Sequence, residues 1–455
     1  MSAATREALP PGPRAPRPAQ IAAWIARPLA FMERCQRRYG DVFTMRVENG
    51  KTWVFFSHPD AIKQIFTGDP RVFHAGEGNV ILLPILGARS VLLLDETEHL
   101  EQRKLMLPSF HGERMQRYGE LMNEIAEREI ERWPSGEPFR LWPHMQDLTL
   151  EVILRAVFGV EQGARLERLR GALKSMLDWT VDRRRMLGLA LLGPHRINES
   201  RTFRRALAPF DSVILDEVRQ RRDDPDLSAR DDVLSLLLQA RYEDGSPMSD
   251  AELRDQLVTL LVAGHETTAT SLSWAIERLV RHPAALERLT EEARAGEDGY
   301  VDAVVKETLR LRPVIPIVVR LLKEPAEIGG WTLPAGVSAV PAVHLVHRRA
   351  DVYPDPHRFR PERFLESPAG TYTWIPFGGG VRRCLGASFA QFEMNIVLSA
   401  IARSVQLAPA DAEPERVTRR AISMTPLRGA EVIVTGRSRL PAHGQAGGER
   451  TAAAA

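Results

Sequence analysis

The residue with the clearest capacity for chemistry is a cysteine in a glycine-rich segment. Cys384 ends the sequence Phe-Gly-Gly-Gly-Val-Arg-Arg-Cys (377–384), and a stretch of helical periodicity follows over 387–402. The glycines would let the backbone approach a flat partner closely. A helix amino terminus, loop amides and nearby arginines are expected to lower the thiol pKa. The thiolate is an axial ligand of haem iron that favours oxygen–oxygen cleavage, whereas an isolated cysteine is more commonly a small buried apolar residue.

A second group of polar residues lies in the middle of a long predicted helix. Ser249 and Glu252 have the spacing of a capping box, and apolar residues follow at helical spacing up to His282, before Pro283. Such a helix would be about 50 Å long. Its centre, Ala-Gly-His-Glu-Thr-Thr (263–268), combines a glycine with threonines that compete for the carbonyl one turn back. We therefore expect the helix to open locally beside a ligand; the alternative is a polar stretch solvated on its outer face.

An acid and a base share one face of another predicted helix. Glu307 and Arg310 are three residues apart, just before Arg312-Pro313 ends the helix. By themselves they predict an exposed ion pair that contributes about 0–1 kcal/mol to stability.

The elements that position these residues are mainly helical. The segment 42–56 alternates apolar and polar residues around Asn49-Gly50 and predicts a β-hairpin, and 326–340 predicts short strands between turns. Helical periodicity dominates elsewhere. The fold class is therefore mainly α, with small β sheets at one side and one domain over 21–435. Residues 1–20 form an expected proline-rich flexible arm, and 436–455 an expected disordered tail.

Composition excludes several classes of partner and location. Lys+Arg number 61 and Asp+Glu 59, which argues against a polyanion-binding surface, so we expect no nucleic-acid partner. No apolar stretch reaches the roughly 20 residues needed to span a bilayer. The chain has two cysteines, Cys35 and Cys384, which is consistent with a reducing cytoplasm and is too few for an iron–sulfur cluster.

Three segments together resemble the cytochrome P-450 superfamily. The haem-binding signature Phe-Gly-x-Gly-x-Arg-x-Cys-x-Gly is met at every fixed position from Phe377 to Gly386. Glu307-x-x-Arg310 is accompanied by Pro-Glu-Arg-Phe (361–364), and 263–268 matches the family pattern Ala-Gly-x-(Asp/Glu)-Thr-(Thr/Ser). The resemblance spans nearly the whole chain and implies the cytochrome P-450 fold as a single haem domain.

The resemblance assigns roles to individual residues. Cys384 would be the iron ligand of haem b, iron protoporphyrin IX. Thr267 would hydrogen-bond dioxygen, and Glu266 would help to relay protons to it. Glu307, Arg310 and Arg363 would lock the core behind the cysteine loop. The residues expected to contact the haem are His99, Arg103, Ala263, Arg320, Phe377, Gly378, Arg382, Cys384 and Gly386.

Four of these residues would bind the haem propionates. His99 and Arg103 lie at i and i+4 and therefore on one helix face. Arg320 and Arg382 add two guanidinium groups, which suit carboxylates because they bind them bidentately. For His99 the alternative is an ordinary surface histidine.

The implied function is a cytoplasmic, monomeric haem-thiolate monooxygenase. It would insert one oxygen atom from O2 into a hydrophobic small molecule (a fatty acid, terpenoid, steroid or polyketide) by hydroxylation or epoxidation. Segments 79–86, 186–192 and 314–318 match regions that line pockets in the family. Electrons would come from a ferredoxin and its reductase, docking near Lys104, Arg114 and Arg383. A peroxide-using or non-oxygenating haem-thiolate enzyme and a haem-based ligand sensor remain alternatives.

Overall fold

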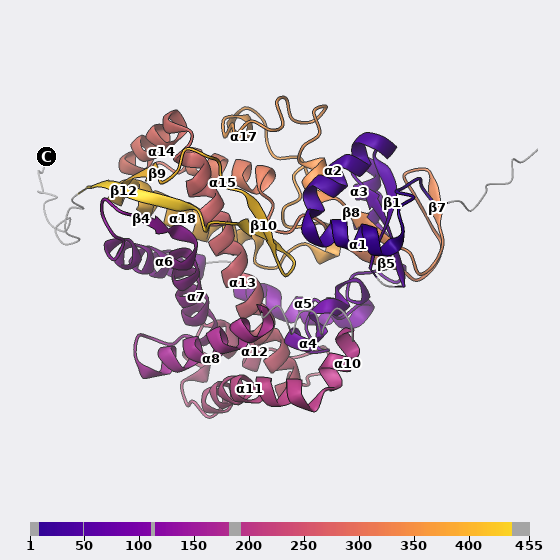
Figure 1. Cartoon of the computed structure of the whole chain (residues 1–455). Coiled ribbons are helices and arrows are strands. Elements are labelled where there is room, and N and C mark those ends of the chain that lie inside the picture. The colour runs from indigo at the N-terminus through magenta and orange to yellow at the C-terminus, as the bar shows by residue number, and fades with distance from the viewer. Residues whose placement is uncertain (1–8, 49, 111–113, 182–192, 439–455) are drawn as a thin grey trace, which may run out of the picture.

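The computed structural model describes residues 9–48, 50–110, 114–181 and 193–438. A helical body occupies most of the molecule (Figure 1). The helices within these ranges are α1 (Arg17–Ala26), α2 (Pro28–Tyr39), α3 (Pro59–Thr67), α4 (Leu83–Leu86), α5 (Glu96–Met106), α6 (Arg114–Glu131), α7 (Leu141–Phe158), α8 (Ala164–Val181), α10 (Pro194–Glu199), α11 (Arg201–Arg222), α12 (Val233–Gln239), α13 (Asp250–Leu279), α14 (Pro283–Ala295), α15 (Gly299–Leu311), α16 (Val343–Val346), α17 (Arg363–Glu366) and α18 (Ala387–Ser404).

Within the described ranges, the strands form four small sheets. They are β1 (Val42–Glu48), β2 (Lys51–Phe56), β3 (Phe73–His74), β4 (Pro138–Arg140), β5 (Arg320–Leu322), β6 (Ala326–Ile328), β7 (Trp331–Leu333), β8 (Ser338–Pro341), β9 (Val405–Pro409), β10 (Val417–Arg420), β11 (Ser423–Pro426) and β12 (Glu431–Arg437). Their order is β1-β2-β8-β5-β3 in the largest sheet, with β4-β12-β9, β10-β11 and β6-β7 in the others. The predicted mainly α class is confirmed.

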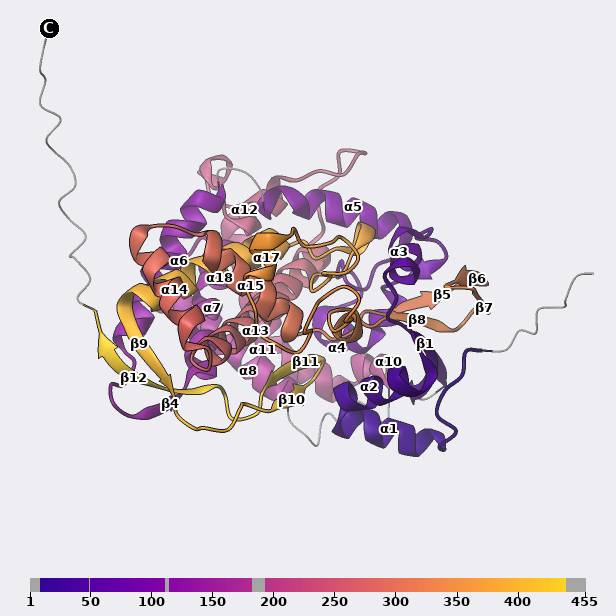
Figure 2. The ribbon, with the colours of Figure 1, turned by 90° about the horizontal axis from the view of Figure 1, so that it is seen from above.

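The predicted hairpin and short strands are also confirmed. β1 and β2 pair antiparallel, with Met45 opposite Trp53. β2 then pairs with β8 in parallel, which joins two segments far apart in the sequence. The expectation that all sheets lie at one side is wrong: β4, β9 and β12 lie across the helical body from β1 (Figures 1 and 2). These strands were missed because pairing between distant segments, and not local alternation, creates them.

Part of the predicted flexible arm is packed against the largest sheet. The Thr44 hydroxyl donates to the carbonyl of Pro10 at 2.6 Å, and the Thr44 amide donates to the carbonyl of Pro11 at 2.9 Å. A Cβ on Gly12 would lie 2.0 Å from the Thr44 carbonyl oxygen, so this position needs glycine. The prolines lack amide protons but still offer carbonyls to β1, the edge strand. Helix α1 then begins at Arg17, inside the range expected for the arm.

Helix α13 is the central element. Its capping box is formed: the Ser249 amide donates to the Glu252 carboxylate at 2.7 Å, and the Glu252 amide donates to the Ser249 hydroxyl at 3.3 Å. The helix ends at Leu279, three residues before the predicted end. It stays α-helical through 263–268, so the predicted local opening is absent. Gly264 instead provides space for α7, because a Cβ there would lie 3.1 Å from the Ile153 side chain.

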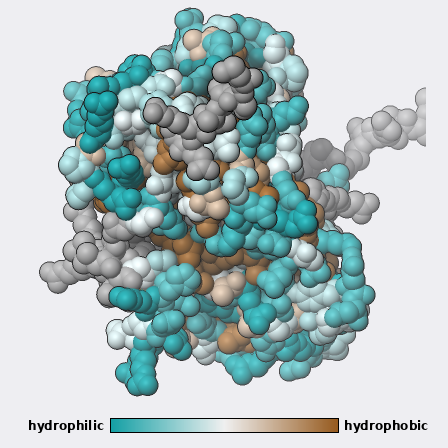
Figure 3. Space-filling model, turned by 90° about the vertical axis from the view of Figure 1, so that its right-hand side faces the viewer, coloured by the Kyte–Doolittle hydropathy of each residue, from teal (hydrophilic) through white to brown (hydrophobic). Residues whose placement is uncertain are grey.

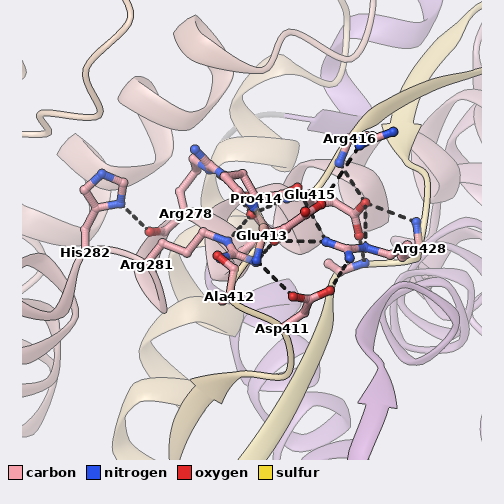
Figure 4. A network of polar contacts seen from close by, with 12 residues as sticks. Arg278, Arg281, His282, Asp411, Ala412, Glu413, Pro414, Glu415, Arg416 and Arg428 are labelled. Carbon is pink, nitrogen blue, oxygen red and sulfur yellow. Dashed lines mark hydrogen bonds and ion pairs between the residues drawn. The ribbon is translucent and has the colours of Figure 1, made fainter.

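Hydrogen bonds and an ion pair hold the carboxyl end of α13 to the loop after β9 (Figure 4). Arg281 donates to the carbonyls of Ala412 and Glu413 at 3.0 and 2.6 Å. Arg428, which follows β11, also donates to the Glu413 carbonyl, at 3.0 Å, and pairs with Asp411. The central helix is therefore fixed at its far end to the carboxyl-terminal segment.

Candidate haem-thiolate site

The cysteine loop is a closed backbone structure directly before α18. The Cys384 amide donates to the Phe377 carbonyl at 3.0 Å, and the Arg383 amide donates to the Gly380 carbonyl at 3.1 Å. Gly386 is the residue before the first turn of α18. These contacts place Cys384 at the helix amino terminus, as predicted, and the residue as a whole is exposed.

Two glycines of the loop make a contact that the sequence did not predict. Gly380 has φ +64°, and a Cβ there would lie 1.9 Å from the Phe66 carbonyl oxygen. A Cβ on Gly379 would lie 2.3 Å from the Phe66 ring. These two glycines therefore let the loop pack on α3. Gly378, with φ +69°, faces more open space, because a Cβ there would meet its nearest neighbour, the Val318 side chain, only at 4.0 Å.

Exposed positions on central elements define a hollow. Ala263 is exposed and Thr267 is half-buried, although Leu261 and His265 on the same helix are buried. Cys384 is exposed, and its neighbour Leu385 packs against a hydrophobic cluster that includes Leu257 and Leu261 of α13. Small or reactive side chains thus face open space in the middle of the fold, which matches a bound planar group.

The thiol pKa does not follow the sequence-based prediction. Although Cys384 is exposed as a residue, the surrounding protein desolvates its thiol, and this raises the pKa of Cys384. This effect exceeds the lowering by the Gly386 amide, Arg103 and Arg383. The prediction of a lowered pKa is wrong for the protein without a bound metal, because desolvation of a thiolate outweighs three favourable contacts. A bound metal ion would reverse this balance, since a coordinating thiol is deprotonated.

Four cationic or potentially cationic side chains gather beside the hollow. Burial, together with the positive charges of Arg382, Arg103 and Arg320, lowers the pKa of His99 to about 3. The structure thus brings together the four residues that the sequence assigned to the propionates. His99 is buried, so it is not an ordinary surface histidine.

Two of the arginines differ in how their charge is compensated. Arg382 donates to Asp95 at 2.5 Å and to the Leu94 carbonyl at 2.6 Å. Arg320 is buried, yet its one hydrogen bond among the described residues goes to the adjacent Val319 carbonyl. Burial and the charge of Arg382 lower the pKa of Arg320 to about 10. A buried guanidinium without a carboxylate partner fits a bound anionic group.

Thr267 and Glu266, two polar residues in the middle of α13, have different partners. The Thr267 hydroxyl donates to the Ala263 carbonyl at 2.7 Å. Burial raises the pKa of the Glu266 carboxyl, and this effect exceeds the lowering by the charge of Arg420. Its Oε1 lies 3.6 Å from the Arg420 Nε. Arg420 was not predicted from the sequence, because nothing in its local sequence connects β10 to α13.

The predicted lock behind the cysteine loop is formed. Arg310 donates to both carboxylate oxygens of Glu307 at 2.7 and 2.8 Å, and both side chains have no exposed surface. Arg363 reaches the same carboxylate at 3.1 Å. The sequence alone had indicated an exposed pair, and the resemblance supplied the correct buried arrangement.

His347 connects this lock to the cysteine loop and was also missed. Arg310 donates to the His347 carbonyl at 2.7 Å, and His347 Nδ1 lies 3.2 Å from the Arg310 carbonyl. The Ile375 amide donates to His347 Nε2 at 2.8 Å. The ring is therefore neutral with its proton on Nδ1, and it holds the chain two residues before Phe377.

The expected pocket segments are partly described. Segment 79–86 contains Ile81, whose side chain is exposed, and α4. Segment 314–318 leads into β5, and segment 186–192 lies outside the described residues. No described helix combines the length and apolarity needed to cross a membrane.

Comparisons with known proteins agree with this geometry. The cytochrome P450 family model matches residues 10–432. A putative cytochrome P450 135B1 of Mycobacterium tuberculosis is 45% identical, with 98% of this chain and 95% of the relative covered. A putative cytochrome P450 137 of the same species is 40% identical over 93% of this chain and 90% of the relative. The solved structure of retinoic acid bound cyanobacterial CYP120A1 has a TM-score of 0.79 at 24% identity, covering 94% of this chain and 99% of that chain.

Proposed function

We propose that this chain hydroxylates or epoxidises a hydrophobic small molecule with electrons from an external ferredoxin system. The chain belongs to the cytochrome P450 family and is a haem-thiolate monooxygenase. The observation that carries the proposal is the exposed residue Cys384 directly before α18, together with the buried Arg320, whose guanidinium has no hydrogen-bonded carboxylate among the described residues.

The residues present fit haem b. Cys384 would hold the iron through its sulfur. Arg320, with Arg103, His99 and Arg382, would hold the propionates, and Ala263, Phe377, Gly378 and Gly386 would border the ring. When bound, the haem supplies iron that accepts electrons and activates dioxygen.

Thr267 and Glu266 would control protons on the side of α13. The Thr267 hydroxyl donates to the Ala263 carbonyl, so its oxygen lone pairs can accept a hydrogen bond from another donor. Glu266 is half-buried and can exchange a proton with solvent. We assign Glu266 as the proton source and the Thr267 Oγ1 as the acceptor that passes the proton into the hollow.

The surface near the largest sheet supports an apolar substrate. Figure 3 shows apolar side chains gathered in a hollowed band across one face, with hydrophilic surface above and below it. Ile81 is 45% exposed in the segment that precedes α4. An apolar lining would exclude water and favour a fatty acid, terpenoid, steroid or polyketide.

A ferredoxin with its reductase would supply electrons to a cytoplasmic monomer. Arg383 is exposed next to Cys384, and Lys104 lies on α5, where it pairs with Glu243 at 2.8 Å. The side chain of Arg114, the third expected cation, lies outside the described residues. An acidic partner would approach this face by electrostatic attraction.

The test is a carbon-monoxide difference spectrum of the reduced protein with two cysteine variants. Wild type and Cys35→Ser should give the spectrum of a thiolate-ligated haem, and Cys384→Ser should lose it. Cys35 is the matched control because it is buried away from the site. A Cys384→Ser protein with an intact spectrum would overturn the proposal.

Turnover is tested with isotopic oxygen. The holoprotein, ferredoxin, reductase and NAD(P)H are mixed with ¹⁸O2 and a panel of the four compound classes. We expect one labelled atom in the product from at least one class. Conversion that proceeds with peroxide but never with O2 and electrons would point to a peroxide-using enzyme instead.

A further inference from the structure

Two of the Glu–Arg pairs in the described part of the chain, Glu307–Arg310 and Glu266–Arg420, differ in geometry. Glu307 and Arg310 share two hydrogen bonds of 2.7 and 2.8 Å and are fully buried. Glu266 and Arg420 approach only to 3.6 Å, beyond the range of about 2.7–3.2 Å for an N–H···O hydrogen bond. The first pair is locked, whereas the second is in electrostatic contact without a direct bond.

The two facing atoms of the second pair have no other partner in the described part of the chain. Oε1 of Glu266 and Nε of Arg420 are both buried and make no hydrogen bond with the described residues. Arg420 is also the charged group that acts on Glu266, against the desolvation of its carboxyl. Arg420 therefore favours the carboxylate form of Glu266, although the desolvation of the carboxyl is the larger effect.

Arg420 is held in place from outside α13. Its guanidinium lies 4.7 Å from the centre of the Trp142 ring. Trp142 donates through Nε1 to the Thr270 hydroxyl at 3.1 Å, one turn after Glu266 on α13. Arg420 pairs with Ser423 across the β10–β11 hairpin.

The hairpin itself is anchored to α13. Trp274 on α13 donates through Nε1 to the Met424 carbonyl at 3.0 Å, and the Met424 amide donates to the Val314 carbonyl at 2.8 Å. The position of Arg420 is thus set by the hairpin and by Trp142, and not by Glu266.

We propose that Arg420 is a positioning residue for proton delivery, which holds Glu266 as a carboxylate that faces β10. Because no direct hydrogen bond joins the two side chains, the Glu266 carboxylate turns toward Thr267 without breaking one. This inference rests on the proposed role of Glu266 in the monooxygenase reaction. One proton moves from solvent to the Glu266 carboxylate and then to Thr267 Oγ1, and the reaction consumes it. Arg420 keeps its own proton throughout.

The test compares four variants of the holoenzyme: Arg420→Gln, Arg420→Lys, Glu266→Gln and the double variant Arg420→Gln/Glu266→Gln. Oxygen consumption and hydrogen peroxide release are measured in H2O and D2O with ferredoxin, reductase, NAD(P)H and lauric acid as the apolar probe. Arg420→Gln should slow oxygen consumption about three- to tenfold, because one pKa unit changes the carboxylate-to-acid ratio tenfold. It should also raise the peroxide share and the solvent isotope effect, and Arg420→Lys should restore part of the rate.

The matched control is Arg419→Gln. Arg419 neighbours Arg420 on β10 but points to Trp24, with its guanidinium 5.8 Å from that ring. This variant should keep the wild-type rate and isotope effect. Haem content must match wild type in every variant, which separates positioning from misfolding.

The double variant separates this inference from the proposed function. Arg420→Gln should add no further slowing in the Glu266→Gln background. If it slows both backgrounds equally, or leaves the wild-type rate and isotope effect unchanged, Arg420 does not act through Glu266 and the inference is wrong. If Glu266→Gln alone behaves as wild type, the proton role of Glu266 is wrong as well.

Discussion

Arg320 is a cation that the folded chain buries without a hydrogen-bonded carboxylate among the described residues, and Asp95 acts on it only through its charge. Its hydrogen bond to the Val319 carbonyl leaves most of the guanidinium donors for another group. The nearby charge of Arg382 adds repulsion. In a protein without haem, Arg320 should therefore lower stability, and in the holoprotein it should bind a propionate.

These two effects predict that replacing Arg320 weakens haem binding but does not weaken the stability of the haem-free protein. Arg320→Gln should release haem to a haem scavenger at least about tenfold faster, because a charge-assisted hydrogen bond contributes roughly 1.5–3 kcal/mol. The same change should leave the stability of the haem-free protein equal or higher. The measurements are the haem-transfer rate and urea unfolding of both forms. Unchanged haem release would show that Arg320 does not bind a propionate.

At the scale of elements, Glu307 joins α15 to the segment that carries α17. Its carboxylate receives hydrogen bonds from Arg310, Arg363 and the Arg360 amide. Without that charge, two guanidinium groups would remain buried beside a neutral side chain. Removing one member of a buried charge network usually costs about 3–5 kcal/mol.

Glu307→Gln is therefore expected to lower the free energy of unfolding by about 3–5 kcal/mol and to give haem-poor protein. The control is Glu366→Gln, which removes an exposed carboxylate that pairs with Arg360. That change should cost less than about 1 kcal/mol. Urea unfolding and the haem-to-protein ratio test both variants, and equal losses in the two would contradict the buried lock.

His347 makes the link between α15 and the cysteine loop sensitive to acid. Burial and the charges of Arg310 and Arg348 hold the pKa of His347 well below its usual value. The unfolded chain regains a pKa of about 6.5, so it binds more protons than the folded chain below that pH. The stability contributed by neutral His347 is full above about pH 6.5 and declines as the pH falls.

We predict that His347→Gln flattens this acid dependence. The slope of unfolding free energy against pH, between about pH 5 and 6.5, should decrease by up to about 1.4 kcal/mol per pH unit. His357→Gln, at an exposed histidine, is the control and should keep the wild-type slope. The measurement is the urea midpoint of unfolding across this pH range. If the free energy of unfolding changes with pH in parallel for wild type and His347→Gln, His347 is not a buried, neutral residue that links α15 to the cysteine loop.

At the scale of the whole molecule, charge is nearly balanced, with a formal net charge of +2. The attraction that we propose for an acidic ferredoxin must therefore be local, near Arg383 and Lys104. Salt screens such exposed charges over about 10 Å at 0.1 M ionic strength.

We accordingly expect the rate of reduction by ferredoxin to fall as ionic strength rises. Arg383→Gln should reduce both the rate at low salt and its salt dependence, whereas Arg358→Gln, on a segment away from Cys384 in sequence, should change neither. Stopped-flow reduction across a salt series provides the measurement. A rate independent of salt would exclude this docking face.

The sequence by itself determined the local features. The capping box of α13, the β1–β2 hairpin and the cysteine loop before α18 were all predictable, because each depends on residues within one short segment. The resemblance then identified Glu307, Arg310 and Arg363 as one buried group. The family followed from these segments and is confirmed by the family match.

Only the tertiary structure decided the contacts between distant segments. It placed Arg420 beside Glu266, His347 beside Ile375 and Phe66 against the loop glycines. It also reversed the expected pKa direction of Cys384, since burial depends on every element around the sulfur. Short-range patterns determine elements, whereas desolvation and partner choice arise from packing between elements that are remote along the chain.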